Sequence, residues 1–447
     1  MGVPSVTEYQ DVERALLARW PETRMEPSLD RIRLLMELMG DPQRSFTSVH
    51  ITGTNGKTST GRMIDSLLRE LGLRVGRYSS PHLQDMRERI ALLGELIDEE
   101  TFVRTYEEVL PYVGIVEERL GLPMSFFEVI TGMAYAAFAD APVDAAVVEV
   151  GLGGAWDATN VIDAAVAVFT PISLDHTHLL GDDVTDIAAE KSGIIKPDSF
   201  VVMAQQPVPA AEVVMRRCAE VGATVAREGL EFGVLSQDVA VGGQLVSIRG
   251  LETTYEDVFI PLHGTYQAGN AAVAIAAVEA FGAKKELEID AVRAAFADVR
   301  SPGRLEVVRR SPTVLVDSSH NPAGMRATVA ALDESFSFQR LVGVVGVMRD
   351  KDVAGVLEAL EPALDHVVVT RNNSSRSMPP EELGELARDV FGPERVTVVE
   401  RLDDALDTAI SLAEEGADLV ASGLGVLVTG SVVTAGDARI LLGGTVS

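Results

Sequence analysis

The sequence lacks the features that mark secreted and membrane-bound proteins. Cys218 is its single cysteine, so the chain can form neither an intramolecular disulfide nor a thiolate metal cluster. No uncharged apolar run reaches about 18 residues, the length that indicates a membrane-spanning helix. The first twenty residues contain no apolar signal segment. We therefore expect a cytoplasmic protein that does not associate with membranes.

Basic residues are also scarce. The chain has 38 lysines and arginines against 67 aspartates and glutamates, which gives a net charge of −29. Proteins that bind nucleic acids generally need a basic face, so this balance argues against a nucleic-acid partner. We expect small-molecule partners and a monomeric chain.

What remains is typical of a globular enzyme. Apolar residues make up 47% and charged residues 23% of the chain. A chain of 447 residues is long for one hydrophobic core, so we expect two domains.

Short runs rich in valine, isoleucine and alanine alternate with amphipathic stretches, a pattern typical of parallel α/β architecture. The strands expected in the first part are 48–53, 74–79, 145–150, 166–171 and 200–204. The stretch 223–262 alternates like a small antiparallel layer, and residues 269–281 predict a buried helix. A second series of strands is expected at 313–317, 341–347, 366–370, 395–399 and 425–429.

The segment 299–304 (VRSPGR) reads as a hinge between these two series. We predict an N-terminal domain over residues 1–299, with a mostly parallel sheet and a small antiparallel layer. Residues 300–447 should form a Rossmann-like, doubly wound domain.

The most informative stretch is 49–60 (VHITGTNGKTST). It reads as a buried strand, a glycine-bounded loop and a helix, which is the layout of a phosphate-binding loop. Lys57 would reach the outer phosphates of a nucleotide, and the Thr58 hydroxyl would bind Mg²⁺. The usual pattern has four residues between its glycines, whereas Gly53 and Gly56 enclose two. An ordinary strand-to-helix turn is the alternative, but the apolar strand and the helical sequel favour phosphate binding.

Polar side chains follow three strands of the first series, at the sheet edge where parallel α/β folds bind ligands. Ser80 follows strand 74–79, Glu149 lies on strand 145–150, and His176 follows strand 166–171. Each has an ordinary explanation as a turn, solvated or core residue. Together they form a plausible set of Mg²⁺ ligands, because this ion takes few protein ligands and fills its sphere with water and phosphate oxygens.

Lys191 lies on a short, mostly apolar helix that ends near Gly193. From spacing alone we favour a surface charge pair with Glu190; the alternative is a partly desolvated, reactive lysine. In the second part, Asp317 and His320 follow strand 313–317, where a helix N-cap region is the alternative explanation. The stretch 371–378 (RNNSSRSM) predicts a surface loop.

The ordered set of motifs resembles the folylpolyglutamate synthase/dihydrofolate synthase branch of the Mur-ligase superfamily, in its bifunctional actinobacterial form. The resemblance spans essentially the whole chain. The motifs that carry it are GTNGKTST (53–60), SSPHL (79–83), ERI (88–90), FFE (126–128), EVGLGG (149–154), WDATN (156–160), SLDHTHLLGDD (173–183), AEKSGII (189–195), HGTYQAGN (263–270), SPGRLE (301–306), DSSHNPAG (317–324), RDKD (349–352) and TGSVVTAG (429–436).

This resemblance implies roles for individual residues. Those that would bind ATP are Asn55, Gly56, Lys57, Thr58, Asn270, Arg304 and Asp317. Magnesium, in two sites, would be held by Thr58, Ser80, Glu149 and His176. Lys191 would react with CO₂ to give a carbamate, N6-carboxylysine, that helps to hold the metal. A potassium ion is a further cofactor that the resemblance suggests. The residues implied in catalysis are Lys57, Glu149, His176 and Lys191.

The resemblance also implies where the other substrates bind. The pterin would lie near Leu29, Asp30, Arg31, Ser125, Phe126, Phe127, Glu128, Asp157, Ala158 and Thr159. His320 and Ser431 are weaker candidates for holding the incoming glutamate.

The function that follows is ATP-dependent amide ligation of L-glutamate to dihydropteroate, to reduced folates, or to both, through an acyl phosphate. Two alternatives stay open at this point. One is a peptidoglycan-precursor ligase of the same superfamily, and the other is a regulatory ATPase with a phosphate-binding loop. The motif Asn-Lys-x-Asp of guanine-specific switches is absent from the sequence.

Overall fold

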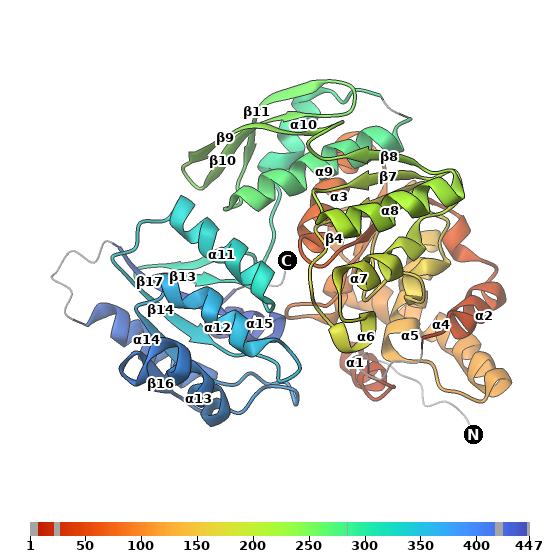
Figure 1. Cartoon of the computed structure of the whole chain (residues 1–447). Helices are drawn as coiled ribbons and strands as arrows, with labels where there is room; N and C mark the ends of the chain where they lie inside the picture. The colour runs from red at the N-terminus through yellow and green to blue at the C-terminus, as the bar shows by residue number, and fades with distance from the viewer. Residues whose placement is uncertain (1–7, 22–26, 284, 416–422, 445–447) are drawn as a thin grey trace.

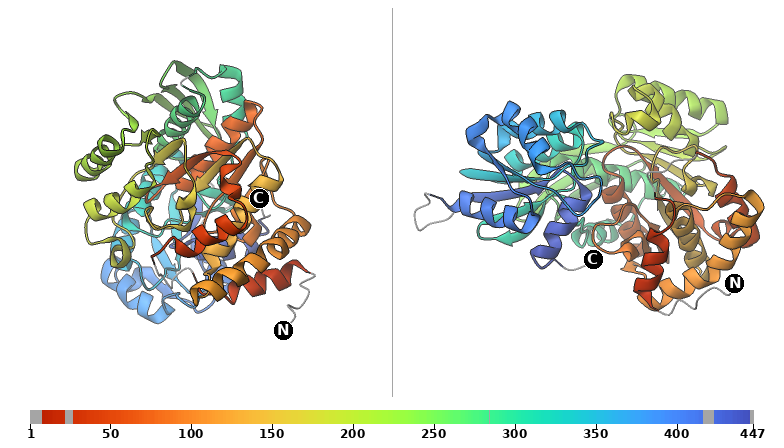
Figure 2. Two further views of the ribbon diagram at one scale, coloured as in Figure 1. Left: turned by 90° about the vertical axis from the view of Figure 1, so that its right-hand side faces the viewer. Right: turned by 90° about the horizontal axis from the view of Figure 1, so that it is seen from below.

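The computed structural model describes residues 8–21, 27–283, 285–415 and 423–444. It contains an eight-stranded sheet, a three-stranded sheet and a six-stranded sheet. The first two belong to an N-terminal unit, up to residue 299, and the third to a C-terminal unit, from residue 300. Figure 1 shows the two units side by side, with the three-stranded sheet above them, and Figure 2 shows the same arrangement from two other sides.

The eight-stranded sheet has the order β4-β3-β2-β5-β1-β6-β7-β8. Its strands are β1 (Thr47–Thr52), β2 (Val75–Tyr78), β3 (Ile90–Leu92), β4 (Glu95–Leu96), β5 (Ala145–Glu149), β6 (Val166–Phe169), β7 (Phe200–Met203) and β8 (Thr224–Arg227). The six strands from β2 to β8 in this order pair in parallel, and β3 and β4 add an antiparallel edge. The parallel sheet predicted from alternating apolar runs is confirmed. The short β3–β4 hairpin was not predicted.

Both faces of this sheet are covered by helices, which explains the continuous apolar character of its central strands. On one face, α3 (Lys57–Glu70), α9 (Thr265–Phe281) and α10 (Ile289–Ala297) share a core with the three-stranded sheet. On the other face, α1 (Tyr9–Leu17), α2 (Asp30–Leu38), α4 (Glu99–Leu120) and α5 (Phe126–Asp140) share a second core. Next to them, α7 (Val184–Lys191) and α8 (Val208–Val221) cover β6 and β7. Helix α9 is buried almost throughout, as its sequence predicts.

The three-stranded antiparallel sheet consists of β9 (Gly233–Ala240), β10 (Gly243–Arg249) and β11 (Thr254–Ile260). The prediction of one antiparallel layer over 223–262 was wrong at its start. The strand β8 pairs in parallel with β7 and closes the main sheet. The residues of β8 alternate between polar and apolar because an edge strand of a parallel sheet is exposed on one side. A strand of an antiparallel layer shows the same alternation, so β8 was assigned to that layer.

The six-stranded sheet of the C-terminal unit has the order β12-β13-β17-β14-β15-β16. Its strands are β12 (Glu306–Arg310), β13 (Thr313–Val316), β14 (Arg340–Val345), β15 (His366–Val369), β16 (Val396–Val398) and β17 (Leu424–Thr429). Helices α11 (Pro322–Ser335), α12 (Val353–Leu360) and α13 (Pro380–Phe391) cover one face, and α14 (Leu402–Glu414) and α15 (Val432–Leu441) cover the other. The five predicted strands are confirmed. The antiparallel edge strand β12 was missed because arginine and glutamate dominate it.

The predicted domain boundary at 299/300 falls in the link between α10 and β12. It coincides with the change from one sheet to the next, and we keep it as our proposal. The predicted surface loop 371–378 is only partly on the surface, because Asn372 and Met378 are buried. Within the described residues, no helix combines the length and the apolar character that a membrane span requires.

Candidate active site

The loop between β1 and α3 has the geometry of a phosphate-binding loop. Gly53 and Gly56 have φ values of 146° and 89°, where a side chain would be strained. A Cβ atom on Gly53 would lie 1.9 Å from the Thr170 hydroxyl, so the loop also has no room for one. Lys57 begins α3, and its Nζ donates to the carbonyls of Gly53 (3.3 Å) and Thr54 (3.4 Å). The ammonium thus lies under its own loop, at the positive end of a fourteen-residue helix.

Glu149 ends β5 next to this loop, because it pairs with Ile51 across the parallel ladder. The Thr58 hydroxyl donates to its carboxylate at 3.0 and 3.1 Å. Burial raises the pKa of Glu149, and the charge of Lys57 acts in the opposite direction. Burial lowers the pKa of Lys57, and the charges of Glu149 and Asp175 oppose that change. A cation, a hydroxyl and a carboxylate therefore meet beside the anion-binding loop.

We tested whether this edge suits Mg²⁺. The Thr58 and Glu149 oxygens already lie together, and oxygen donors are what this ion prefers. Ser80 is buried beyond the end of the neighbouring strand β2. The Nε2 atom of His176 faces Lys351 Nζ at 3.1 Å, so it would have to exchange partners to bind a metal. No group of three or more histidine, cysteine, aspartate or glutamate side chains is arranged to hold a metal among the described residues. Thr58 and Glu149 fit the ion directly, and a complete sphere would need phosphate and water oxygens.

Lys191 contradicts the surface charge pair that its spacing favoured. It ends α7 with 4% of its surface exposed, and the ion pairs of the described residues do not include one between Lys191 and Glu190. Burial lowers its pKa to about 7, and the charge of Lys57 acts in the same direction. The close packing of Gly154 against the Lys191 backbone encloses the helix end, since a Cβ there would lie 2.8 Å from the Lys191 carbonyl. A large share of these amines is therefore neutral near neutral pH, the form that acts as a nucleophile.

The C-terminal unit contacts the phosphate loop through the start of α11. Asn321 is the N-cap residue of this helix, and its side-chain oxygen accepts from the Gly324 N–H. Its amide also exchanges two hydrogen bonds with the Asn55 amide, at 3.1 and 3.2 Å. The loop that would hold the phosphates is therefore in direct contact with the second unit.

Asp175, in the loop after β6, is the meeting point of these contacts. Lys351 Nζ lies 2.6 Å from one carboxylate oxygen, while Asn321 Nδ2 (3.2 Å) and His320 Nε2 (3.4 Å) lie near the other. Hydrogen bonds and positive charges from the C-terminal unit hold the pKa of Asp175 well below its usual range, although burial alone would raise it. Burial lowers the pKa of His176 to about 4, and Lys351 acts in the same direction. Asp175 is thus an anion and His176 a neutral ring.

The other residues predicted to bind ATP differ in how near they are to the loop and in whether their polar atoms already have partners. Asn270 on α9 is close to Gly56, where an added Cβ would lie 2.7 Å from its Oδ1 atom. Arg304 is near enough for its charge to act on Lys57 and Glu149. Asp317 is buried, and its oxygens accept from Leu305 N–H, Ser319 N–H and the Thr328 hydroxyl. In this conformation Asp317 holds the C-terminal unit together, and its nucleotide contact stays a prediction.

The predicted pterin-binding residues come from three segments of the N-terminal unit. Leu29, Asp30 and Arg31 open α2, while Ser125 caps α5 and precedes Phe126, Phe127 and Glu128. Asp157, Ala158 and Thr159 form a short turn after the glycine-rich loop. Arg31 Nε pairs with Glu128 at 2.9 Å across 97 residues of sequence, so the first two segments are joined. The Phe127 ring lies over Gly151, where a Cβ would come within 2.4 Å of it. Burial raises the pKa of Asp157 to about 6, although hydrogen bonds from Leu152 and Thr159 oppose the shift.

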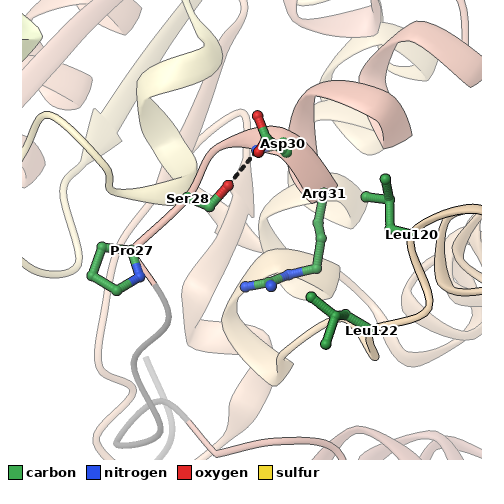
Figure 3. Close-up of a pocket in the computed structure, with 6 residues that line it drawn as sticks. All are labelled: Pro27, Ser28, Asp30, Arg31, Leu120 and Leu122. Carbon is green, nitrogen blue, oxygen red and sulfur yellow. Dashed lines mark hydrogen bonds between the residues drawn. The ribbon is translucent and has the colours of Figure 1, made fainter.

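An open cavity of about 470 Å³ lies at the start of α2, within the size range of small-ligand sites. Its lining residues are Pro27, Ser28, Asp30, Arg31, Leu120 and Leu122. Figure 3 shows Arg31 between Ser28 on one side and the two leucines on the other. The cavity offers an apolar wall and a cation, which suit a flat, partly polar ligand.

The pair Arg31–Glu128 gives a first prediction. Its side chains are only 7% and 6% exposed, so Arg31→Met leaves a buried carboxylate without its cation. We expect a loss of about 3 kcal/mol in the free energy of unfolding, measured by urea titration. The double variant Arg31→Met/Glu128→Gln removes the stranded charge and should recover part of the loss. Equal losses in the single and double variants would contradict this account.

The two glutamate candidates differ in accessibility. His320 lies beside Asp175 at the contact between the units. Ser431 is the buried N-cap residue of α15, where it accepts from the Thr434 N–H at 2.9 Å and from Asn372 at 3.1 Å. In this conformation the Ser431 hydroxyl is occupied, and its role toward glutamate stays a prediction.

Sequence reasoning gave no role to three residues that the structure places at the centre: Asp175, Asn321 and Lys351. The available signals were their presence in the motifs SLDH, SHNP and RDKD and the position of these motifs after the strands expected at 166–171, 313–317 and 341–347. Which of these polar residues cross to the other unit depends on how the two sheets dock, and no local pattern encodes that.

The chain is similar in sequence to known ligases. The profile of the Mur ligase middle domain matches residues 51–278, and that of the Mur ligase glutamate ligase domain matches residues 303–431. The dihydrofolate synthase/folylpolyglutamate synthase of Mycobacterium tuberculosis is 51% identical, with 98% of this chain and 94% of that protein covered.

Solved structures agree. The Mycobacterium tuberculosis folylpolyglutamate synthase complexed with ADP has a TM-score of 0.95 at 51% identity, covering 98% of this chain and 99% of that one. Escherichia coli FolC in complex with DHPP and ADP has a TM-score of 0.86 at 28% identity, with 99% of each chain covered.

Proposed function

The chain belongs to the Mur ligase family, in its dihydrofolate synthase/folylpolyglutamate synthase branch, and we propose that it joins L-glutamate to a pterin carboxylate at the expense of ATP. The observation that carries this proposal is the meeting of the phosphate loop with the second unit. Asn55 and Asn321 bind each other there, and Asp175 binds Lys351. A ligase needs such an enclosed site, because water would hydrolyse an acyl phosphate.

The reaction we propose has two steps. A carboxylate oxygen of the pterin substrate attacks the γ-phosphorus, the bond to the β,γ-bridging oxygen breaks, and ADP leaves with its electron pair. The amine of glutamate then attacks the acyl carbon, phosphate leaves, and the amine proton passes to solvent or a nearby base. Lys57 and the backbone N–H groups of its loop offset the charge on the transferring phosphoryl group.

Magnesium fits the oxygens of Thr58 and Glu149, and when bound it would neutralise phosphate charge. Ser80 and His176 are the further ligands we propose; a second magnesium ion and a potassium ion stay expectations. Lys191 is proposed as a carbamate: its neutral amine adds to CO₂ and releases one proton, which makes an anion from a buried cation. The support is its burial and a pKa of about 7.

The pterin is proposed to bind where α2 and α5 begin, beside Phe127 and Asp157, with the cavity at Arg31 as its entrance. Dihydropteroate carries its carboxylate on the aminobenzoyl ring, and reduced folates carry theirs on the glutamate attached to that ring, so the two acceptors share the pterin and aminobenzoyl parts but place the carboxylate at different distances. Glutamate would enter from the C-terminal unit near His320. The cytoplasmic location and the monomeric state stay predictions.

The test is ADP release by the purified protein with MgATP and L-glutamate. Dihydropteroate is added to one sample and tetrahydrofolate to another. ADP release that requires both glutamate and a pterin is expected, and the pattern between the two samples identifies the acceptor. No pterin-dependent turnover by protein that binds ATP would overturn the proposal.

A further inference from the structure

Lys351 reaches from the C-terminal unit to the loop after β6 of the N-terminal unit, which lies beside the phosphate loop. It lies between β14 and α12, and its side chain is 8% exposed. Its Nζ contacts Asp175 at 2.6 Å and His176 Nε2 at 3.1 Å, both in the loop that follows β6. That loop is tied to the phosphate loop, because the Thr54 hydroxyl and the backbone of Ser173 exchange hydrogen bonds of 3.0 Å. The ammonium is therefore fixed beside the place where phosphates would bind.

The ammonium has an unused donor. A lysine ammonium carries three N–H groups, and two of those on Lys351 are accounted for by Asp175 and His176. Among the described residues, no atom accepts a hydrogen bond from the third N–H of Lys351. Water or an anionic ligand would therefore accept the hydrogen bond of this third N–H.

Positive charge converges at this point. The charges of Lys351 and Arg304 both lower the pKa of Lys57, which means that the three cations lie close together. Such a group is unfavourable unless an anion joins it. Glu149 and Asp175 balance part of this charge, and a nucleotide phosphate would balance the rest.

Asp175 sets the position of Lys351. Its other oxygen faces Asn321 and His320, so this one carboxylate connects three side chains of the C-terminal unit. When the units separate, Lys351 leaves with the C-terminal unit, and the phosphate loop keeps only its own lysine.

We propose that Lys351 is a catalytic residue that the C-terminal unit delivers to the γ-phosphoryl group, and that Asp175 positions it. The proposal rests on the phosphoryl transfer described above. As the carboxylate oxygen bonds to the γ-phosphorus and the bridging oxygen departs with ADP, an N–H of Lys351 that Asp175 does not hold donates to a phosphoryl oxygen. No proton is transferred in this step. ATP bound to the open protein lacks this cation, so its hydrolysis without an acceptor is suppressed.

The first experiment compares Lys351→Met, Lys351→Arg and the control Lys285→Met with the unchanged protein. Lys285 is an exposed lysine between α9 and α10, outside the site. For Lys351→Met we expect kcat to fall about 100-fold with KM for glutamate nearly unchanged. The thermal midpoint should fall as well, because Asp175 loses its buried partner, so the rates are compared at a temperature well below both midpoints. Lys351→Arg should recover about a tenth of the activity, and Lys285→Met should keep all of it. A rise in KM for glutamate at unchanged kcat would overturn the proposal and assign Lys351 to the glutamate carboxylate.

The second experiment needs no acceptor, so it separates this proposal from the choice of substrate. The affinity for MgADP is measured with and without aluminium fluoride, which mimics the transferring phosphoryl group. Lys351→Met should weaken the binding of MgADP with aluminium fluoride at least tenfold and leave that of MgADP alone unchanged. Asp175→Asn should show the same split in milder form. Equal weakening of both ligands, or of neither, would overturn the phosphoryl role.

Discussion

Replacing Lys57 with methionine should lower the rate of pterin-dependent ADP formation about 1,000-fold. Methionine keeps an unbranched side chain that lacks only the terminal ammonium group of lysine, and it carries no charge. The ammonium of Lys57 is half-buried under Gly53 and Thr54, at the start of α3. In a buried site a fixed cation acts on phosphate charge with little screening by water. Removing this cation should therefore mainly lower kcat, as measured in steady-state assays with all three substrates.

The lowered pKa of Lys57 separates this effect from unfolding. The pKa of Lys57 is lowered by burial, which means that the folded protein gains little from this charge when no ligand is bound. The free energy of unfolding of Lys57→Met should accordingly match or slightly exceed that of the unchanged protein. A variant that kept kcat within tenfold would contradict the assignment of this loop to the transferred phosphates.

Replacing Lys191 with alanine should lower kcat by about 100-fold or more, because it removes the group proposed to carry the carbamate. The Lys191 side chain is buried, so the space that it leaves is enclosed, and a small carboxylate could occupy it in place of the carbamate. Acetate added at millimolar concentration should therefore restore part of the activity of Lys191→Ala and leave the unchanged protein unaffected. Equal activity of the alanine variant with and without acetate would count against the carbamate.

The unchanged protein offers an independent check through pH. The pKa of Lys191 is about 7, so its neutral fraction rises from about a tenth at pH 6 to about nine tenths at pH 8. Carbamate forms from the neutral amine alone. At a fixed concentration of dissolved CO₂, activation of CO₂-depleted protein should be stronger at pH 8 than at pH 6. The low pKa predicts about a tenfold difference between the two pH values; a difference of about 100-fold, which an ordinary lysine would give, would contradict it.

The sequence predicts well what depends on local pattern. The run 49–60 gave the strand, loop and helix of the phosphate site, because two glycines with positive φ leave few alternatives. The parallel strands were found because burial on both faces demands continuous apolar residues. The same rule failed at β12, whose exposed outer edge is polar, and at β8, whose one-sided exposure imitates an antiparallel layer.

The site was less predictable because its contacts join distant parts of the chain. Glu190 and Lys191 look like a surface pair when only their neighbours in sequence are considered. The burial of Lys191 follows from the packing of α7 against the loop at Gly154. Arg31 and Glu128 likewise pair because α2 and α5 start side by side, and Asp175 meets Lys351 because two sheets dock. No repeating pattern in the sequence predicts these contacts between distant residues.

The central claim is that a pterin carboxylate is activated as an acyl phosphate, and oxygen transfer tests it most directly. Dihydropteroate labelled with ¹⁸O in both carboxylate oxygens is incubated with MgATP, L-glutamate and the protein, and the released phosphate is analysed by mass spectrometry. The account predicts one ¹⁸O atom in each phosphate formed, because the attacking carboxylate oxygen stays on phosphorus when glutamate displaces it. Tetrahydrofolate labelled in the same way at its terminal carboxylates serves if it is the acceptor. Turnover that releases phosphate without ¹⁸O would contradict the account.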